Sequence, residues 1–418
     1  MSGYLPRVID ASLADRLMSA GAVLIEGPKA CGKTSTAEQQ AASRIYLDTD
    51  DQARAALGVD PSLVLSGDRP QLVDEWQLDA TRVWNYVRAE VDRRHGTGLY
   101  ILTGSATPPD DTRRHSGAGR FARLLMRPMS LFESGDSSGE MSLAALLDSN
   151  RPTAKATGVT VRRYAELVVR GGWPLNLTRS VTAAARANID YVATITEVDL
   201  PTIDPARRHP RLALRLLQAL ARNVGMDYVV TRIAQEASDD DSEIARSTVY
   251  DYLAPLERLM VLDPLEAWSS HLRSRARLRT SPRVQFCDPS VAVAALRAGP
   301  DQLLGDLNFF GYLFEALVVR DLRVFADAVD GTVQHYRDSD DLEIDALVTA
   351  GDGRWAAFEV KLGQADIDKA AANLLAFARK VDTTKIGQAA TLAVITATGY
   401  GYTRPDGVVV IPAAALGP

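Results

Sequence analysis

One stretch of eight residues limits what this chain can fold into more than any other. Residues 27–34 read Gly-Pro-Lys-Ala-Cys-Gly-Lys-Thr and match the P-loop pattern G-x-x-x-x-G-K-[ST]. The pattern carries weight when a buried strand precedes it and a helix follows it. The apolar residues 22–25 and the helical stretch that begins at Ser35 provide both. The sequence therefore predicts a phosphate-binding loop in a parallel α/β domain.

Each position of this loop has a chemical role. The glycines let the backbone curl until its N–H groups point at phosphates, Lys33 reaches the β- and γ-phosphate oxygens, and Thr34 ligates Mg²⁺. A nucleoside triphosphate with Mg²⁺ is the expected ligand. The predicted nucleotide-binding residues are Gly27, Pro28, Lys29, Ala30, Cys31, Gly32, Lys33 and Thr34.

Hydrolysis needs an acidic partner, and Asp74 and Glu75 follow the apolar residues 71–73. We expect Asp74 to hold the Mg²⁺ shell and Glu75 to polarise the attacking water, although Glu75 is open to a second interpretation as a surface carboxylate. Thr103 and Ser105 end the next apolar run, where a γ-phosphate sensor would lie at the carboxyl edge of the sheet.

Two arginines downstream are further candidates. Arg120 and Arg123 precede an apolar segment, and either guanidinium could contact a phosphate, within the chain or across a subunit interface. An ordinary surface position explains them equally well.

Length and composition bound the rest of the prediction. At about 150 residues per domain, 418 residues indicate two or three domains. A net charge of -6, from 47 Lys and Arg against 53 Asp and Glu, excludes a uniformly basic coat for nucleic acid. Cys31 and Cys287 have no metal-site spacing, and we find no export signal or membrane span, so a cytoplasmic protein is expected.

Several motifs together resemble a known family. The P-loop, residues 73–75, residues 103–105, residues 119–130 and Gly171-Gly172-Trp173-Pro174 occur in the order found in a family of bacterial and archaeal predicted AAA-type ATPases. The resemblance implies ATP as the nucleotide and three domains: a P-loop ATPase domain over 1–135, a helical and winged-helix region over 136–282, and a mixed α/β nuclease-like domain over 283–418. Trp76-Gln77 departs from the pattern, because an aliphatic residue is expected after Glu75.

The middle region shows two features of DNA-binding domains. Residues 231–234 and 247–253 resemble the two helices of a helix-turn-helix, and Arg273, Arg275, Arg277 and Arg279 recur with period two, as on one face of a strand. Such a row could grip DNA phosphates. A spacer or a subunit contact, paired with acidic surface, is the alternative.

The spacing of residues around a predicted hairpin brings several C-terminal carboxylates together. Gly351-Asp352-Gly353 predicts a tight loop, and a hairpin symmetric about Asp352 sets Asp345 opposite Glu359, and Glu343 opposite Lys361. Opposed carboxylates about 5 Å apart repel one another unless a cation lies between them, which suggests Mg²⁺ or Mn²⁺.

These residues look like the PD-(D/E)xK motif of restriction endonucleases. Asp345, Glu359 and Lys361 fill its three places, with Asp345 and Glu359 as metal ligands, Lys361 as a catalytic cation and Glu315 as a third carboxylate from a helix. Two interpretations stay open: an ATPase coupled to a nuclease acting on DNA, and a nucleotide-switched module that binds nucleic acid or protein without cleavage. A second copy of the chain, in a homo-oligomer, is a further candidate partner.

Overall fold

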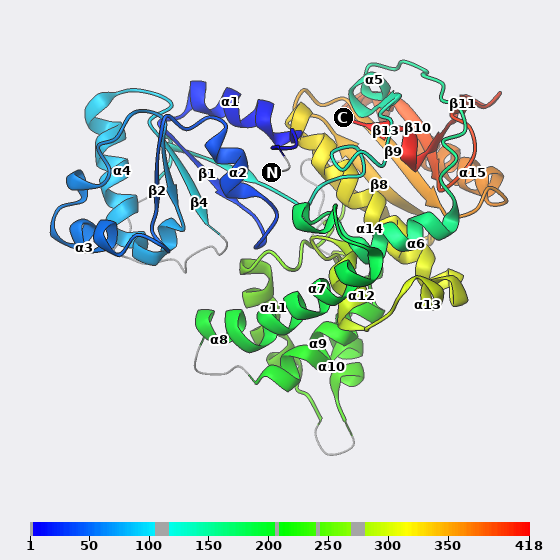
Figure 1. Ribbon diagram of the computed structural model, residues 1–418. Coiled ribbons are helices and arrows are strands. Elements are labelled where there is room, and N and C mark those ends of the chain that lie inside the picture. Colours follow the sequence, from blue (N-terminus) through cyan, green and yellow to red (C-terminus); the bar gives the residue numbers. More distant parts are fainter. Residues whose placement is uncertain (1–2, 105–116, 205–208, 240–242, 269–280) are drawn as a thin grey trace. The chain divides into compact units, whose positions relative to one another are not determined.

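The computed structural model describes residues 3–104, 117–204, 209–239, 243–268 and 281–418. The chain divides into two compact units (Figure 1). The first comprises Met1–Pro128 with Arg258–Met260, and the second comprises Met129–Glu257 with Val261–Pro418. The helical region and the C-terminal sheet, which the sequence predicts as separate domains, thus lie in one compact unit, and the three-domain division stays a prediction.

The first unit is a five-stranded parallel sheet in the order β2-β3-β4-β1-β5. Its strands are β1 (Ala22–Glu26), β2 (Ser43–Tyr46), β3 (Gln71–Asp74), β4 (Tyr100–Gly104) and β5 (Phe121–Leu125). Its helices are α1 (Ile9–Ser19), α2 (Lys33–Glu38), α3 (Asp51–Val59) and α4 (Ala80–Arg94). The predicted parallel sheet is therefore confirmed.

Both faces of this sheet are covered. Ala22 and Leu24 of β1 point into a core formed with α3 and α4, which includes Trp84. Helices α1 and α2 contact β1 and lie on the other side of the sheet in Figure 1. The four strands predicted from apolar runs are present. Strand β5 was not predicted, because Arg123 interrupts its apolar residues and only Leu124 of the five is buried.

The second unit begins with helices. They are α5 (Leu143–Leu147), α6 (Val161–Arg170), α7 (Val181–Thr194), α8 (Leu200–Ile203), α9 (Pro210–Arg222), α10 (Val230–Ala237), α11 (Arg246–Arg258), α12 (Pro289–Ala295) and α13 (Pro300–Gly305). The predicted helical stretches 211–222 and 247–260 correspond to α9 and α11. A two-stranded pair, β6 (Met141–Ser142) with β13 (Leu416–Gly417), joins the beginning and end of this unit.

A short hairpin follows α11, and we call its two legs, residues 261–268 and 281–287, the wing hairpin. Leu265 and Arg283 pair across it through two backbone hydrogen bonds of 3.1 and 2.9 Å. Arg283 also bridges to Asp227, which precedes α10, so three short extended segments lie side by side. The predicted strand near residues 284–286 is one of these segments and is no part of the large sheet.

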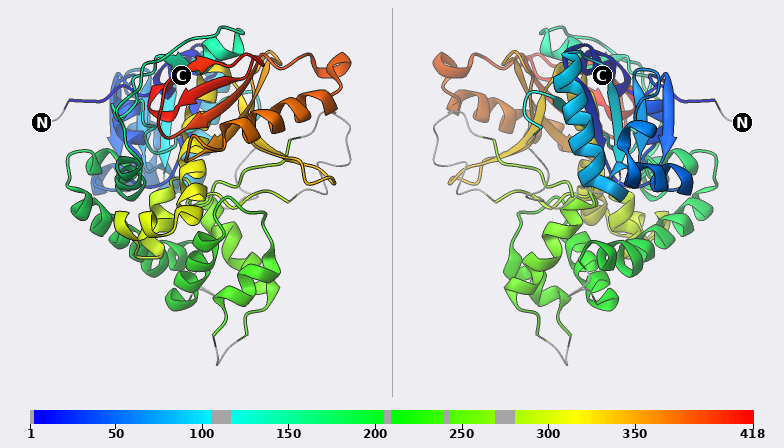
Figure 2. Two further views of the ribbon diagram at one scale, coloured as in Figure 1. Left: turned by 90° about the vertical axis from the view of Figure 1, so that its right-hand side faces the viewer. Right: turned by 90° about the vertical axis from the view of Figure 1, so that its left-hand side faces the viewer.

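The C-terminal part is a six-stranded mixed sheet in the order β11-β12-β10-β9-β8-β7. Its strands are β7 (Thr332–Arg337), β8 (Glu343–Thr349), β9 (Trp355–Lys361), β10 (Thr391–Thr396), β11 (Tyr402–Thr403) and β12 (Val409–Pro412). Its helices are α14 (Leu307–Ala326), α15 (Ile367–Lys380) and α16 (Thr383–Ile386). Figures 1 and 2 show α14 and α15 on opposite sides of the sheet. Within the described ranges, no helix is both long and apolar enough to cross a bilayer.

The wing hairpin is attached to the edge of this sheet. Trp268 donates its backbone N–H to the His335 carbonyl at 2.6 Å, and the Trp268 ring lies 5.7 Å from Trp355 and 5.8 Å from Phe377. The His335 side chain is fully buried, and its Nε2 lies 3.2 Å from the Ser281 carbonyl oxygen. Both legs of the hairpin are therefore held against β7.

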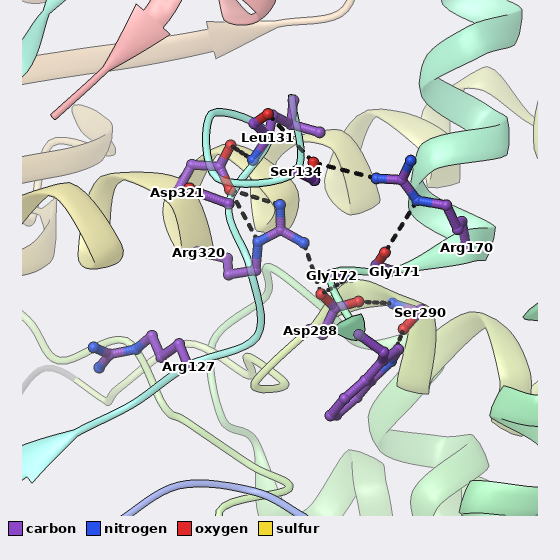
Figure 3. A network of polar contacts seen from close by, with 12 residues as sticks. Arg127, Leu131, Ser134, Arg170, Gly171, Gly172, Asp288, Ser290, Arg320 and Asp321 are labelled. Atoms are coloured by element: carbon purple, nitrogen blue, oxygen red, sulfur yellow. Dashed lines mark hydrogen bonds and ion pairs between the residues drawn. The ribbon is translucent and has the colours of Figure 1, made fainter. Parts of the chain in front are cut away.

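A buried polar network fixes the start of the second unit (Figure 3). Arg320 bonds to Asp288 at 2.7 Å and to Asp321, and Asp321 accepts the Leu131 N–H at 3.0 Å. Asp288 in turn accepts the Gly172 N–H at 2.9 Å. The network satisfies two carboxylates that are almost fully buried, so it holds residues 129–131, α12 and α14 in one arrangement.

The Gly-Gly-Trp-Pro motif packs into this network. Trp173 is 4% exposed and its Nε1 donates to the Ser290 hydroxyl at 3.0 Å, which makes it a packing anchor. The Gly172 carbonyl accepts the Met129 N–H at 2.7 Å. A Cβ added at Gly172 would lie 2.2 Å from the Met129 backbone oxygen, so no side chain fits there.

We expect Gly172→Ala to lower the free energy of unfolding by about 1–3 kcal/mol, because backbone must move to relieve the overlap. Chemical denaturation measures the change. The matched control is Gly305→Ala at the end of α13, where an added Cβ meets no atom within 4 Å. The control should change stability by less than about 1 kcal/mol. Equal effects at the two positions would contradict the packing argument.

The buried His335 makes stability depend on pH. Burial lowers the pKa of His335 to about 4, and the nearby Arg283 charge acts in the same direction. Because the folded pKa lies below that of the unfolded chain, stability present at neutral pH is lost as the pH falls. Between pH 7 and pH 5, the wild type should lose about 2 kcal/mol more than His335→Gln. Identical pH profiles of unfolding for the two proteins would refute this assignment.

Candidate functional site

The carboxyl ends of the parallel strands bring the predicted phosphate-site residues together. Asp74, the last residue of β3, lies opposite Thr103 of β4. Thr103 is also level with Ile25 near the end of β1, and the P-loop follows β1 directly. Residues that are 29 or more positions apart in the sequence thus meet at one edge, where open parallel sheets bind their ligands.

Thr34, Asp74 and Thr103 form one hydrogen-bonded group. The Thr34 hydroxyl donates to the two Asp74 carboxylate oxygens at 3.0 and 3.1 Å, and the Thr103 hydroxyl donates to Oδ1 at 2.5 Å. Burial raises the pKa of Asp74, while the two hydroxyls act in the opposite direction. Hydroxyl and carboxylate oxygens are the hard ligands that Mg²⁺ prefers, so the donor set fits this ion.

Lys33 is folded into the loop. Its ammonium donates to the Gly27 and Pro28 carbonyls at 2.9 and 2.8 Å, and the side chain is buried. A Cβ at Gly27 would lie 2.2 Å from the Met126 backbone oxygen, so the loop passes directly against the end of β5. The P-loop is held tightly, with its cation inside the curl of the backbone.

Glu75 lies at the turn directly after Asp74. Its φ of +51° redirects the chain, and its carboxylate accepts a hydrogen bond from the Gln77 side chain. The same turn sends Trp76, 2% exposed, into the core beside Trp84. The departure from the family pattern at Trp76 is therefore accommodated by packing. Ser105, predicted as a second sensor, lies outside the described residues.

Sequence reasoning missed Arg7. This side chain is 7% exposed and donates to the Cys31 carbonyl of the P-loop at 2.9 Å and to the Arg127 carbonyl at 2.8 Å. It braces the loop from the N-terminal segment. No sequence pattern marks this role, because a lone arginine near a terminus has no characteristic spacing.

The structure places Arg120 away from the phosphate site of its own chain. Its carbonyl accepts the Ala22 N–H where β1 begins, whereas the P-loop follows the other end of that strand, about 13 Å away at 3.3 Å per residue. Its guanidinium pairs with Asp92 of α4 at 2.5 Å. The prediction of a phosphate contact within the chain is wrong for Arg120, because register puts it at the opposite edge of the sheet.

The predicted register of the C-terminal hairpin is confirmed. Ala346 pairs with Phe358 and Val348 with Ala356, the symmetry expected about Asp352. This register brings Asp345, Glu359 and Lys361 together: the Lys361 ammonium lies 3.2 Å from Asp345 and 2.6 Å from Glu359. Asp345 also accepts the Val360 N–H at 2.8 Å.

The surroundings of these carboxylates differ from the prediction. Arg283 of the wing hairpin lies 3.0 Å from Glu315 and 3.9 Å from Asp345, and it also pairs with Glu343. In the part of the chain that is described, no group of three or more His, Cys, Asp or Glu side chains is arranged to hold a metal ion. The expected metal cluster of Glu315, Asp345 and Glu359 is therefore not formed, because Arg283 and Lys361 lie among the carboxylates.

Burial dominates the electrostatics of this cluster. Burial raises the pKa of Glu315 to about 8 and that of Glu359 to about 7, and the neighbouring Asp345 charge adds to both shifts. Burial alone would lower the pKa of Lys361, but the adjacent Asp345 and Glu359 carboxylates raise it. The sequence pattern found three of these residues and missed Arg283, which lies more than 60 positions upstream of Asp345. The Arg273–Arg279 row lies outside the described residues.

A comparison with known protein families finds a match for the first unit. Residues 19–134 match the model of an AAA domain family. The first unit therefore resembles an AAA domain in its sequence, and the parallel sheet that carries the P-loop is compatible with this match. Residues 161–302 and 310–416 match two domains of unknown function, DUF8612 and DUF4143. A search of curated protein sequences finds no match.

Two solved structures share limited similarity with the chain. A Walker-type ATPase of Pyrococcus abyssi is 13% identical, with a TM-score of 0.41 over 69% of this chain and 94% of that one. The PCH-2 protein of C. elegans is 15% identical, with a TM-score of 0.17 over 31% of this chain and 38% of that one. Similarities this weak add nothing to the geometry above.

The position of Arg120 gives a test. Arg120→Ala should leave the affinity for ATP within about twofold of wild type, and its exposed ion pair with Asp92 should contribute less than about 1 kcal/mol to stability. Isothermal calorimetry and thermal unfolding measure the two quantities. A large loss of ATP affinity would instead place Arg120 at the phosphates of a neighbouring copy.

Proposed function

We propose that the first unit binds ATP with Mg²⁺ and hydrolyses it. The observation that carries this proposal is the hydrogen-bonded group of Thr34, Asp74 and Thr103 beside the P-loop. These three side chains come from α2, β3 and β4, and their convergence has no simpler structural purpose at the edge of a sheet. The match of residues 19–134 to AAA domains supports the same assignment.

In this proposal the chain's own residues have separate roles. When ATP binds, the Lys33 ammonium leaves the Gly27 and Pro28 carbonyls and bonds to phosphate oxygens instead. Because Lys33 is buried, the phosphates then supply its charge-assisted hydrogen bonds. Thr34 and Asp74 hold Mg²⁺, which would neutralise charge on the phosphates. Glu75 orients and deprotonates the attacking water, and Thr103 keeps the Asp74 carboxylate in place.

The middle region is proposed to be a winged helix. Helices α10 and α11, followed by the wing hairpin, give the order of elements that this fold requires, with residues 225–228 as the third extended segment. The arginine row that the sequence predicts as a cationic wing, residues 273–279, lies outside the described residues. A contact with DNA phosphates through this row is part of the proposal.

The C-terminal unit has two candidate functions. The order helix, three strands, two helices, strand from α14 to β10, together with Asp345, Glu359 and Lys361, supports a restriction-endonuclease-like fold. Cleavage would require Mg²⁺ or Mn²⁺ among carboxylates that already pair with Arg283 and Lys361. This pairing favours the second function, a nucleotide-switched module that binds nucleic acid or protein and cuts nothing.

Two variants separate binding from turnover. Lys33→Ala should abolish ATP binding in calorimetry, because the buried cation of the loop is lost. Glu75→Gln should retain ATP affinity and lower the rate of phosphate release by about 100-fold or more, because the general base is removed. Lys385→Ala, at an exposed lysine of the second unit, is the control and should match wild type. Normal turnover by both site variants would refute the assignment.

A further inference from the structure

The cluster around Asp345 presents a problem of charge. Four carboxylates belong to it, Glu315, Glu343, Asp345 and Glu359. Among the described residues, two cations reach them, Arg283 and Lys361. Three of the carboxylates are at most 8% exposed, namely Glu315, Asp345 and Glu359. Water therefore screens their repulsion poorly. Protonation, which burial favours for Glu315 and Glu359, relieves part of this repulsion, and the cations among the carboxylates balance the charge that is left.

Arg283 is the more constrained of the two cations. The residue is 1% exposed, and its backbone is fixed by hydrogen bonds to Leu265 in both directions. A divalent ion entering between Glu315 and Asp345 would have to displace a guanidinium that has no path to solvent unless the wing hairpin moves. Mg²⁺ also keeps several of its own waters, and a cluster this buried offers little room for them.

We propose that Arg283 takes the place of a divalent cation among the C-terminal carboxylates. The donor set that the restriction-endonuclease-like motif would use for a metal serves here to bind an arginine from the wing hairpin. The cluster thereby joins the winged-helix region to the C-terminal sheet and holds no catalytic metal. This inference concerns the second unit alone and stands apart from ATP binding at the P-loop.

The shape of the Arg283 side chain also suits it to this cluster. Its planar guanidinium reaches in two directions: Nη1 donates to Glu315 at 3.0 Å and lies 3.9 Å from Asp345, and Nη2 pairs with Glu343. A lysine at this position would carry the same charge, but its single ammonium group would reach a third carboxylate less well than the guanidinium does. The bond from Asn373 to Glu359, at 3.4 Å, shows that the far side of the cluster is likewise completed by protein groups.

Binding of Mn²⁺ to the nucleotide-free full-length chain tests this proposal. Isothermal calorimetry and the electron paramagnetic resonance signal of free Mn²⁺ give the number of bound ions. Wild type and Asp345→Asn should bind the same number, because Asp345 holds no ion. Arg283→Met should bind one more ion than wild type, with an affinity at least tenfold higher than that of any residual Mn²⁺ binding by wild type at this cluster. The double variant Arg283→Met/Asp345→Asn should lose that ion.

Arg404→Met is the matched control. It removes an arginine that pairs with two carboxylates, Asp368 and Asp406, outside the cluster, and it should gain no ion. The proposal is overturned if Asp345→Asn lowers the number of ions bound by wild type. It is also overturned if Arg283→Met, shown by circular dichroism to be folded, gains none. Should Arg283→Met fail to fold, the comparison of wild type with Asp345→Asn decides alone. ATP affinity, measured separately, reports on the P-loop proposal.

Discussion

A parallel sheet delivers the carboxyl ends of all its strands to one edge, and the phosphate site of this chain depends on that constraint. Asp74 and Thr103 meet because β3 and β4 run side by side in register, and Thr34 meets them because the P-loop continues from β1. No single segment contains the site. A shift of one residue in either strand pairing would turn Asp74 or Thr103 to the other face and dissolve the group.

The sequence predicted what is set locally. Apolar runs located β1, β3 and β4, and the period-two pattern with a three-residue loop gave the β8–β9 register, because adjacent strands joined by a tight turn leave few alternatives. What depended on distant partners was not predictable. Arg120 was placed at the phosphates, although the pairing of β5 with β1 puts it at the other edge of the sheet.

Arg283 is a second example of a residue whose place depends on a distant partner, and here the sequence analysis missed the residue altogether. The hairpin arithmetic found Asp345, Glu359 and Lys361 and concluded that a cation must separate the carboxylates. The structure places the Arg283 guanidinium 3.9 Å from Asp345, and sequence spacing could not predict this partner because a separate hairpin contributes it. Negative charge in a buried cluster must be balanced by positive charge. The sequence pattern of the carboxylates does not distinguish a metal ion from a guanidinium as the source of that charge.

The wing hairpin explains why the helical region and the C-terminal sheet lie in one compact unit. One leg places Trp268 among Tyr336, Trp355 and Phe377, and the other inserts Arg283 between α14 and β8. Apolar packing and ion pairing thus act on the two legs of the same hairpin. Movement of the helical region relative to the sheet would have to break both at once.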